Sequence, residues 1–239
     1  MSLYRARGVV LRTIKLGEAD RIVSFMTEAH GKVRAVAKGV RKTKSRFGAR
    51  LEPTSHVALL LYEGRELDIV TQAEGIDHYR TIREDLDRLA KAEAVLEAVD
   101  QVAQERENNH RLYQMLLGAL RSLDQRDSPL LVPAFFWKLL SAEGVHPLLD
   151  ECAQCQATVG LVAFDLSVGG TLCRSCRSGV PISDEALRLL RRILGGGLSA
   201  CLAEPASAAT AEIEHLATSA LESHIERRLR SVTALDHSR

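Results

Sequence analysis

The chain has 239 residues, of which 46% are hydrophobic, 26% are charged and 4% are aromatic. This composition is sufficient for one large or two to three small domains with a substantial core, and it excludes a disordered chain. No apolar run approaches the roughly 18 residues of a membrane span, and the N-terminus lacks a secretory pattern, so we expect a soluble, cytoplasmic protein with no membrane partner.

Charge is divided unequally along the chain, although the formal net charge is only +1. Residues 1–50 hold thirteen Lys and Arg against three Asp and Glu, which is +10; the remainder holds nineteen against twenty-eight, which is −9. A basic first part on an acidic remainder indicates a surface for a polyanion. Nucleic acids are the commonest polyanions, and an anionic membrane is the competitor.

Residues 1–80 contain short β-rich runs separated by turns. Polar and apolar residues alternate in the third run, which predicts that Lys32, Arg34 and Val36 face outward. Five short strands in this length favour a five-stranded OB barrel, and an SH3-like barrel fits almost as well. The expected strands are Arg7–Ile14, Asp20–Met26, Lys32–Ala37, His56–Tyr62 and Glu66–Gln72.

The segment between the third and fourth expected strands carries the densest positive charge. No Asp or Glu occurs from Ala29 to Leu51, and no apolar stripe of helical period marks a membrane-surface helix. Phosphate contact is therefore favoured over a solvated loop that is merely basic. Phe47 is a candidate base-stacking side chain, with a core position as an equal alternative. The candidate nucleic-acid-binding residues are Lys32, Arg34, Lys38, Arg41, Lys42, Lys44, Arg46 and Arg50.

Residues 81–148 repeat apolar side chains at helical spacing, which predicts a bundle of three helices. The third helix contains Phe135, Phe136 and Trp137. We interpret this cluster as core, and a partly open ligand pocket is the alternative. The expected helices are Asp85–Gln104, Leu112–Leu123 and a third from about Pro129 or Pro133 to Gly144.

Four of the five cysteines form two C-x₂-C pairs with 17 residues between them, which is the spacing of four-thiolate zinc sites. Four thiolates complete a tetrahedron and leave no position for a catalytic water, so we expect one structural Zn²⁺ per chain in a zinc ribbon at residues 149–180. A disulfide or redox pair is the alternative. The candidate ligands are Cys152, Cys155, Cys173 and Cys176, whereas Cys201 is expected to be a small buried side chain.

The last part of the chain predicts two closing helices. Ser183 caps the first, which ends at the glycine run 195–197. The second is expected from about Ala206 through Leu229. Arg227, Arg228 and Arg230 are then expected near its C-terminus, where they suit the helix dipole.

The sequence contains no H-E-x-x-H, G-x-S-x-G, P-loop or G-x-G-x-x-G motif. A metal-dependent nuclease, whose carboxylates need not be neighbours in sequence, is the alternative that lacks a local motif. The run from His224 to Glu226 has the H-x-E form of zinc deaminases, but both C-x₂-C pairs lie upstream of it and already supply four sulfurs. We therefore expect a binding protein and no enzyme. An RNA-binding or ribosome-associated zinc-ribbon protein is the competing class, and it would prefer structured RNA over single-stranded DNA.

The basic segment and the order of the modules resemble the bacterial recombination mediators of the RecO family. The basic barrel, the helices, the inserted cysteine pairs and the closing helices match over essentially the whole chain. The residues of the basic segment that carry the resemblance are Lys38, Gly39, Arg41, Ser45, Arg46, Leu51 and Pro53.

This resemblance implies an OB domain at residues 1–80 that binds and anneals single-stranded DNA and also takes duplex DNA. It further implies cooperation with RecR to load RecA onto strands coated by single-stranded DNA-binding protein, with a groove in the helical part for the tail of that protein, and a location at the bacterial nucleoid. The combined prediction is an α+β fold, in which the barrel is followed by a helical domain at residues 81–239 that contains the zinc ribbon.

Overall fold

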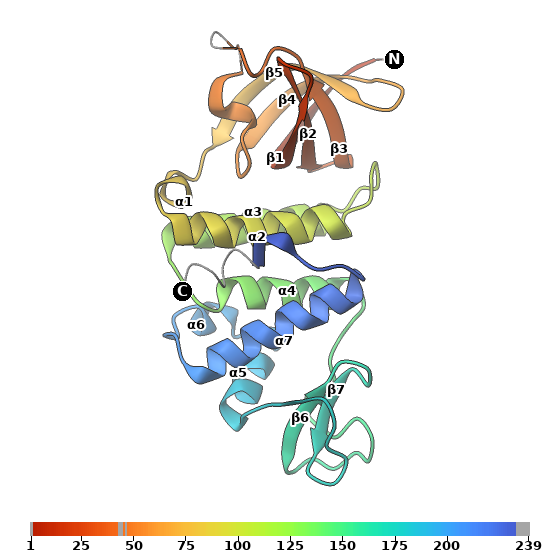
Figure 1. Cartoon of the computed structure of the whole chain (residues 1–239), viewed down its shortest axis with the longest axis vertical. Helices are drawn as coiled ribbons and strands as arrows, with labels where there is room; N and C mark the ends of the chain where they lie inside the picture. Colours follow the sequence, from red (N-terminus) through yellow and green to blue (C-terminus); the bar gives the residue numbers. More distant parts are fainter. Residues whose placement is uncertain (1, 43–44, 46, 233–239) are drawn as a thin grey trace. The chain divides into compact units, whose positions relative to one another are not determined.

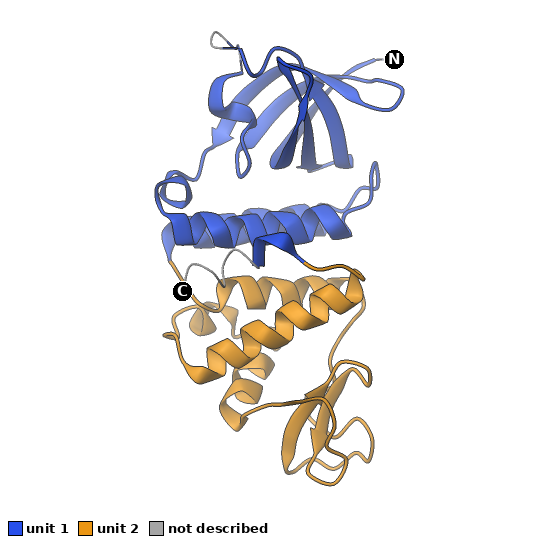
Figure 2. Cartoon of the chain, viewed as in Figure 1, with its two compact units in different colours: residues 1–126, 229–239 blue, residues 127–228 orange. Residues whose placement is uncertain are grey.

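A computed structural model describes residues 2–42, 45 and 47–232 of the chain (Figure 1). By their internal contacts these residues form two compact units, residues 1–126 with 229–239 and residues 127–228 (Figure 2). The sequence predicts a domain boundary at residue 80, where strands give way to helices. The first compact unit instead extends to Arg126, because the three helices that follow the barrel pack with it. Within the described residues, no helix combines the length and the apolar character needed to cross a lipid bilayer.

Unit 1 begins with a closed five-stranded barrel, as predicted. Strand β1 is long and pairs with β2 through its second half and with β4 through its first half, which closes the sheet. The strand order is β1-β2-β3-β5-β4, with β3 and β5 parallel. This order is that of an OB barrel. The strands are β1 Leu3–Leu16, β2 Asp20–Thr27, β3 Gly31–Ala37, β4 His56–Tyr62 and β5 Asp68–Asp77.

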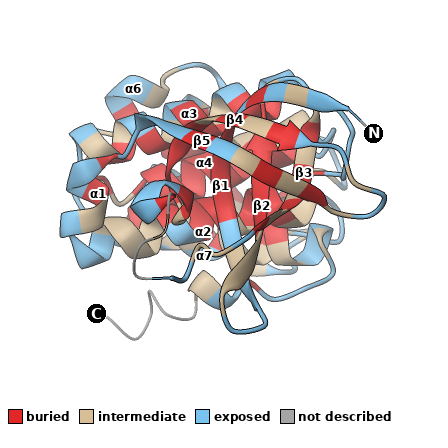
Figure 3. Ribbon diagram, turned by 90° about the horizontal axis from the view of Figure 1, so that it is seen from above, coloured by how far each residue is buried: buried red, intermediate tan, exposed pale blue. Residues whose placement is uncertain are grey.

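The inner face of the barrel follows the predicted alternation. Val33, Ala35 and Ala37 of β3 are fully buried, whereas Lys32 and Arg34 lie on the other face. Buried and more exposed residues likewise alternate along β4 and the first part of β5 (Figure 3), whereas Val23–Thr27 of β2 are all buried. In β3 and β4, apolar residues at every second position therefore build the core of the barrel.

Strand β5 begins and ends later than the predicted Glu66–Gln72. The connection between β4 and β5 is longer than the three-residue turn predicted around Gly64. The Gly64 N–H donates to the Asp68 carboxylate (N to Oδ1, 3.0 Å), which holds the chain in a loop up to Asp68. Asp68 is fully buried and also accepts from the Arg106 guanidinium at 2.6 Å. A buried ion pair from a distant segment thus sets where β5 starts.

Three helices follow the barrel in unit 1: α1 Arg80–Glu84, α2 Leu86–Val102 and α3 His110–Gln125. The side chain of Asp85 caps α2 and that of Asn109 caps α3 by accepting backbone N–H groups. The connection from α2 to α3 lies along β3, where the N–H of Arg106 donates to the carbonyl of Lys32 (3.0 Å). Only glycine fits at Gly31, since a Cβ there would lie 1.8 Å from the carbonyl oxygen of Glu107.

Unit 2 contains helices that pack on one another and, beside them, a small sheet of strand order β7-β6-β8 (Figure 2). The aromatic cluster of α4 is core, as predicted, because Phe135, Phe136 and Trp137 are all at most 5% exposed. Trp137 meets Phe164 of the sheet edge to face, with ring centroids 5.7 Å apart. The elements are α4 Leu131–Ala142, β6 Leu161–Asp165, β7 Gly170–Cys173, β8 Val180–Pro181, α5 Asp184–Leu194, α6 Leu198–Cys201 and α7 Ala208–His224.

The last predicted helix ends earlier than expected. Helix α7 stops at His224, and Glu226 has a left-handed backbone (φ 52°) that a helix cannot continue through. Leu229 is 1% exposed and belongs to unit 1, where the Glu97 carboxylate accepts the next two backbone N–H groups. The prediction that this helix runs through Leu229 is therefore wrong, and Arg227, Arg228 and Arg230 follow its end.

Candidate nucleic-acid interface and candidate metal centre

The basic loop, which we define as residues 38–50, is anchored at its start to the turn between β1 and β2. The Gly39 N–H donates to the Asp20 carboxylate (N to Oδ1, 2.7 Å). The Arg41 guanidinium donates to the carbonyl oxygens of Gly17 (3.2 Å) and Glu18 (2.9 Å). These bonds fix the first residues of the loop, so the cations near them are held on a stiff support.

The described part of the basic loop presents its cations to solvent. Lys38, Arg41, Lys42 and Arg50 are exposed. Lys44 and Arg46 lie outside the described residues, and their role stays a prediction. With no acidic residue in the loop, these side chains form a positive surface that attracts phosphate.

Lys32 and Arg34, the two predicted cations on β3, face acidic groups of unit 1. The Lys32 ammonium donates to the carbonyl oxygen of Asp100 (2.6 Å) and lies 3.7 Å from its carboxylate. Arg34 pairs with Glu105 at 3.2 Å. Asp100 also pairs with Arg12 (2.6 Å) and is only 7% exposed. The side chains of Lys32 and Arg34 are thus drawn toward acidic groups of α2 and of the segment that follows it by opposite charge.

Phe47 is a core side chain and no stacking platform. It is 1% exposed and packs in the barrel cluster that includes Phe25 and Leu61, with Val40 against it. Gly48, the next residue, has a left-handed backbone (φ 53°), so the chain turns directly after the buried Phe47 side chain. The base-stacking interpretation of Phe47 is therefore wrong, because a side chain without accessible area offers no face to a base.

Two further arginines that the sequence reading passed over lie on the outer face of β1. Arg5 and Arg7 are both exposed, with Ala6 between them facing the core. The alternation of charged and small or apolar residues from Tyr4 to Gly8 could have indicated that both arginines face outward, but the denser group of cations after β3 drew the prediction to that segment. These residues line a hollow that is considered below.

The four predicted cysteine ligands come together in unit 2. Their sulfur atoms all lie within 4.8 Å of one another, and the Sγ atoms of Cys155 and Cys173 are 3.6 Å apart. Four sulfurs about 2.3 Å from one zinc ion would be about 3.8 Å from each other, so the cluster has the right size for one tetrahedral ion. The first pair lies in the turn before β6 and the second begins at the end of β7.

The four thiols of this cluster differ in their tendency to ionise. The backbone N–H of Cys173 lowers the pKa of Cys152 to about 6. The pKa of Cys176 is raised to about 12, chiefly because its thiol donates a hydrogen bond to Cys155. One sulfur thus ionises readily, and another keeps its proton in a hydrogen bond. Metal binding requires thiolates, so a divalent ion would displace the remaining protons, and Cys152, Cys155, Cys173 and Cys176 are the residues that would hold it.

Comparison with known proteins agrees with this geometry. The family model described as Recombination protein O N terminal matches residues 1–79, and that described as Recombination protein O C terminal matches residues 83–233. The chain belongs to the RecO family. A RecO-family relative from Frankia casuarinae, named DNA repair protein RecO, is 42% identical over 244 residues, and the alignment covers 100% of both chains. The predicted resemblance to the RecO family is therefore confirmed.

Proposed function

We propose that this RecO-family protein acts in DNA repair by binding single-stranded DNA on its barrel and annealing complementary strands. With RecR, it would help to load RecA onto strands coated by single-stranded DNA-binding protein in recombinational repair. Duplex DNA is a further proposed ligand. In this proposal residues 1–80 are the DNA-binding module, and residues 81–239 carry the contacts to protein partners in the cytoplasm, at the nucleoid.

The observation that carries the DNA-binding proposal is the exposed positive surface of the anchored basic loop. Phosphate contacts from such a surface position a strand without reading its sequence. If about five cations contact phosphates, the logarithm of the affinity for single strands falls with the logarithm of salt concentration at a slope near −3.5. We therefore expect strong dependence on salt and weak dependence on sequence.

Quantitative binding to single-stranded DNA, duplex DNA and structured RNA across a salt series tests the proposal. The variant Lys38→Gln/Lys42→Gln should bind more weakly and reduce the magnitude of the slope by about 1.4, because two phosphate contacts are lost. Arg126→Gln/Arg188→Gln removes the same charge at two exposed positions, one directly after α3 and one on α5, and serves as the control. Tighter binding to structured RNA than to single-stranded DNA would instead favour an RNA-binding or ribosome-associated protein.

We further propose that the metal of the four-cysteine cluster is Zn²⁺ and that it is structural, since four protein sulfurs leave no open position for substrate. No group in the described part of the site has the arrangement of a nucleophile with its base, and we propose that the protein is not an enzyme. Elemental analysis should find one zinc per chain. A nicking assay with Mg²⁺ tests the absence of nuclease activity.

A further inference from the structure

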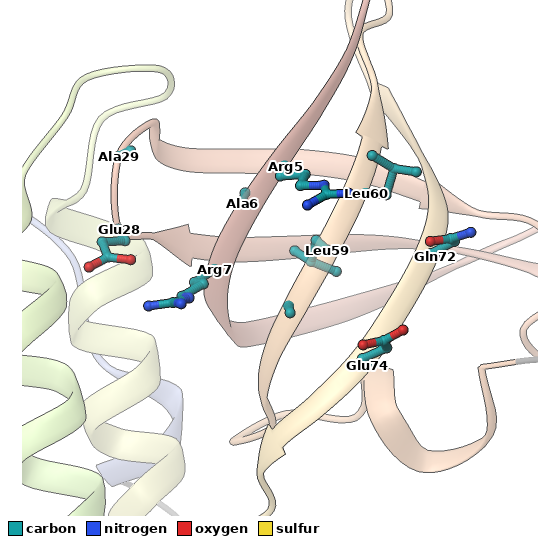
Figure 4. A pocket seen from close by; sticks show the side chains of 10 residues that line it. Arg5, Ala6, Arg7, Glu28, Ala29, Leu59, Leu60, Gln72 and Glu74 are labelled. Carbon is teal, nitrogen blue, oxygen red and sulfur yellow. The ribbon is translucent and has the colours of Figure 1, made fainter.

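A hollow of about 550 Å³ lies on the outer surface of the barrel in unit 1 (Figure 4). Strands β1, β4 and β5 form it, and the turn between β2 and β3 borders it at one end. The barrel is closed, so no strand edge is free here and the hollow consists of side chains on a sheet face. It is separate from the basic loop in sequence, since none of its lining residues comes from residues 38–50.

The strand register orders the side chains of this hollow in two rows. Arg5 of β1 lies beside Leu60 of β4, which lies beside Gln72 of β5. Arg7 lies beside Ala58, which lies beside Glu74. Each row therefore has a guanidinium at one end, an apolar residue in the middle, and an amide or a carboxylate at the other end.

The two guanidinium groups are available to a ligand. Arg5 and Arg7 are exposed, and within the described residues neither guanidinium group makes a hydrogen bond or an ion pair. This distinguishes them from Lys32 and Arg34, which already face carboxylates. Gln72 and Glu74 are also exposed and have no side-chain hydrogen bond within the described residues.

We propose that this hollow holds two adjacent nucleotides of a single strand, as a second contact beside the basic loop; this inference rests on the proposed binding of single-stranded DNA. Arg5 and Arg7 are two residues apart on one strand, so their Cα atoms are about 7 Å apart. This spacing is close to that of neighbouring phosphates in an extended single strand. The bases lie over the apolar floor of Ala58 and Leu60, within reach of the polar groups of β5.

The polar groups on β5 favour bases over other anionic ligands. The amide of Gln72 both donates and accepts hydrogen bonds, and the carboxylate of Glu74 accepts them, which matches the amino and carbonyl groups on base edges. An acidic peptide would bring carboxylates toward Glu74 and toward Glu28 at the border of the hollow, which like charge disfavours. A duplex has its bases paired and stacked, so it cannot lay them on this floor.

An exposed aromatic residue extends the same sheet face beyond the first row. Tyr62 of β4 is 37% exposed and lies beside Leu3 of β1, which is 58% exposed. Tyr62 provides the aromatic ring that Phe47 cannot, because its side chain is partly exposed whereas Phe47 is buried. A third base stacked on Tyr62 would follow the direction set by Arg7 and Arg5.

The test compares a thymidine oligonucleotide with an abasic strand of the same length, because only the former has bases for the floor. Wild type should bind the thymidine strand about tenfold more tightly, the effect of roughly one stacked base. Arg5→Gln/Arg7→Gln should reduce the magnitude of the salt slope by about 1.4, and Tyr62→Ala and Leu60→Ser should reduce the preference for bases. Lys38→Gln/Lys42→Gln, the matched variant in the basic loop, should weaken binding but keep that preference.

A photoreactive thymidine analogue gives an independent readout and should crosslink to the peptide that contains residues 56–62. The inference is overturned if wild type binds single strands but the Arg5→Gln/Arg7→Gln, Tyr62→Ala and Leu60→Ser variants keep its affinity, slope and base preference. It is also overturned if Arg5→Gln/Arg7→Gln loses only the binding of an acidic peptide. If wild type does not bind oligonucleotides even at low salt, the proposed DNA-binding function itself fails. That result differs from the failure of the hollow alone, in which wild type still binds single strands.

Discussion

Asp100 on α2 is the acidic partner of two barrel cations, and its replacement tests the structural role assigned to Lys32. The carboxylate is 7% exposed and lies 2.6 Å from the Arg12 guanidinium and 3.7 Å from the Lys32 ammonium. Removing one partner of a buried pair costs about 3–5 kcal/mol. Arg12 is 49% exposed, and Lys32 keeps its bond to the Asp100 carbonyl. We therefore expect Asp100→Asn to lower the free energy of unfolding of unit 1 by about 3 kcal/mol, the low end of that range.

Urea unfolding followed by far-UV circular dichroism measures this loss. Trp137 is the single tryptophan of the chain and lies in unit 2, so its fluorescence follows that unit separately. A double-mutant cycle of Asp100→Asn with Lys32→Gln should give a coupling energy of about 1 kcal/mol or more. A loss below about 1 kcal/mol, typical of a surface pair, with no coupling would refute this structural role and favour Lys32 as a DNA contact.

Three further outcomes follow from burial and from the cysteine cluster. Phe47→Ala should destabilise unit 1 by about 3–5 kcal/mol in urea unfolding, while the affinity of the folded protein for single strands stays the same; a selective loss of affinity would contradict its core position. Burial lowers the pKa of His56 below 6.5, so the unfolded chain takes up the proton more readily. The urea midpoint of unit 1 should therefore fall as the pH drops below 6.5, until the pH passes the folded pKa, and His56→Gln should remove that part of the dependence. Cys173→Ser should lower the bound metal and the thermal stability of unit 2, whereas Cys201→Ser, outside the cluster, should leave the metal content unchanged, and equal metal content in the two variants would contradict the site.

The sequence by itself determined the features that depend on neighbouring residues. Alternation along β3 predicted which of its side chains enter the barrel, and the spacing of the cysteine pairs predicted the cluster that forms in unit 2. Both patterns are local, because the strand period and the tight turn of C-x₂-C act over a few residues. The RecO-family resemblance rested on the same kind of signal.

Only the tertiary structure decided which cations are neutralised, which aromatic ring is accessible and where the last helix ends. Lys32 and Lys42 are both basic residues in one segment, yet Lys32 faces Asp100, a residue 68 positions away, and Lys42 faces solvent. Phe47 enters the barrel, whereas Tyr62 lies on its outer face. Charge pairing and burial depend on residues that are distant in sequence and become neighbours when helices pack against the barrel, so no local pattern contains them.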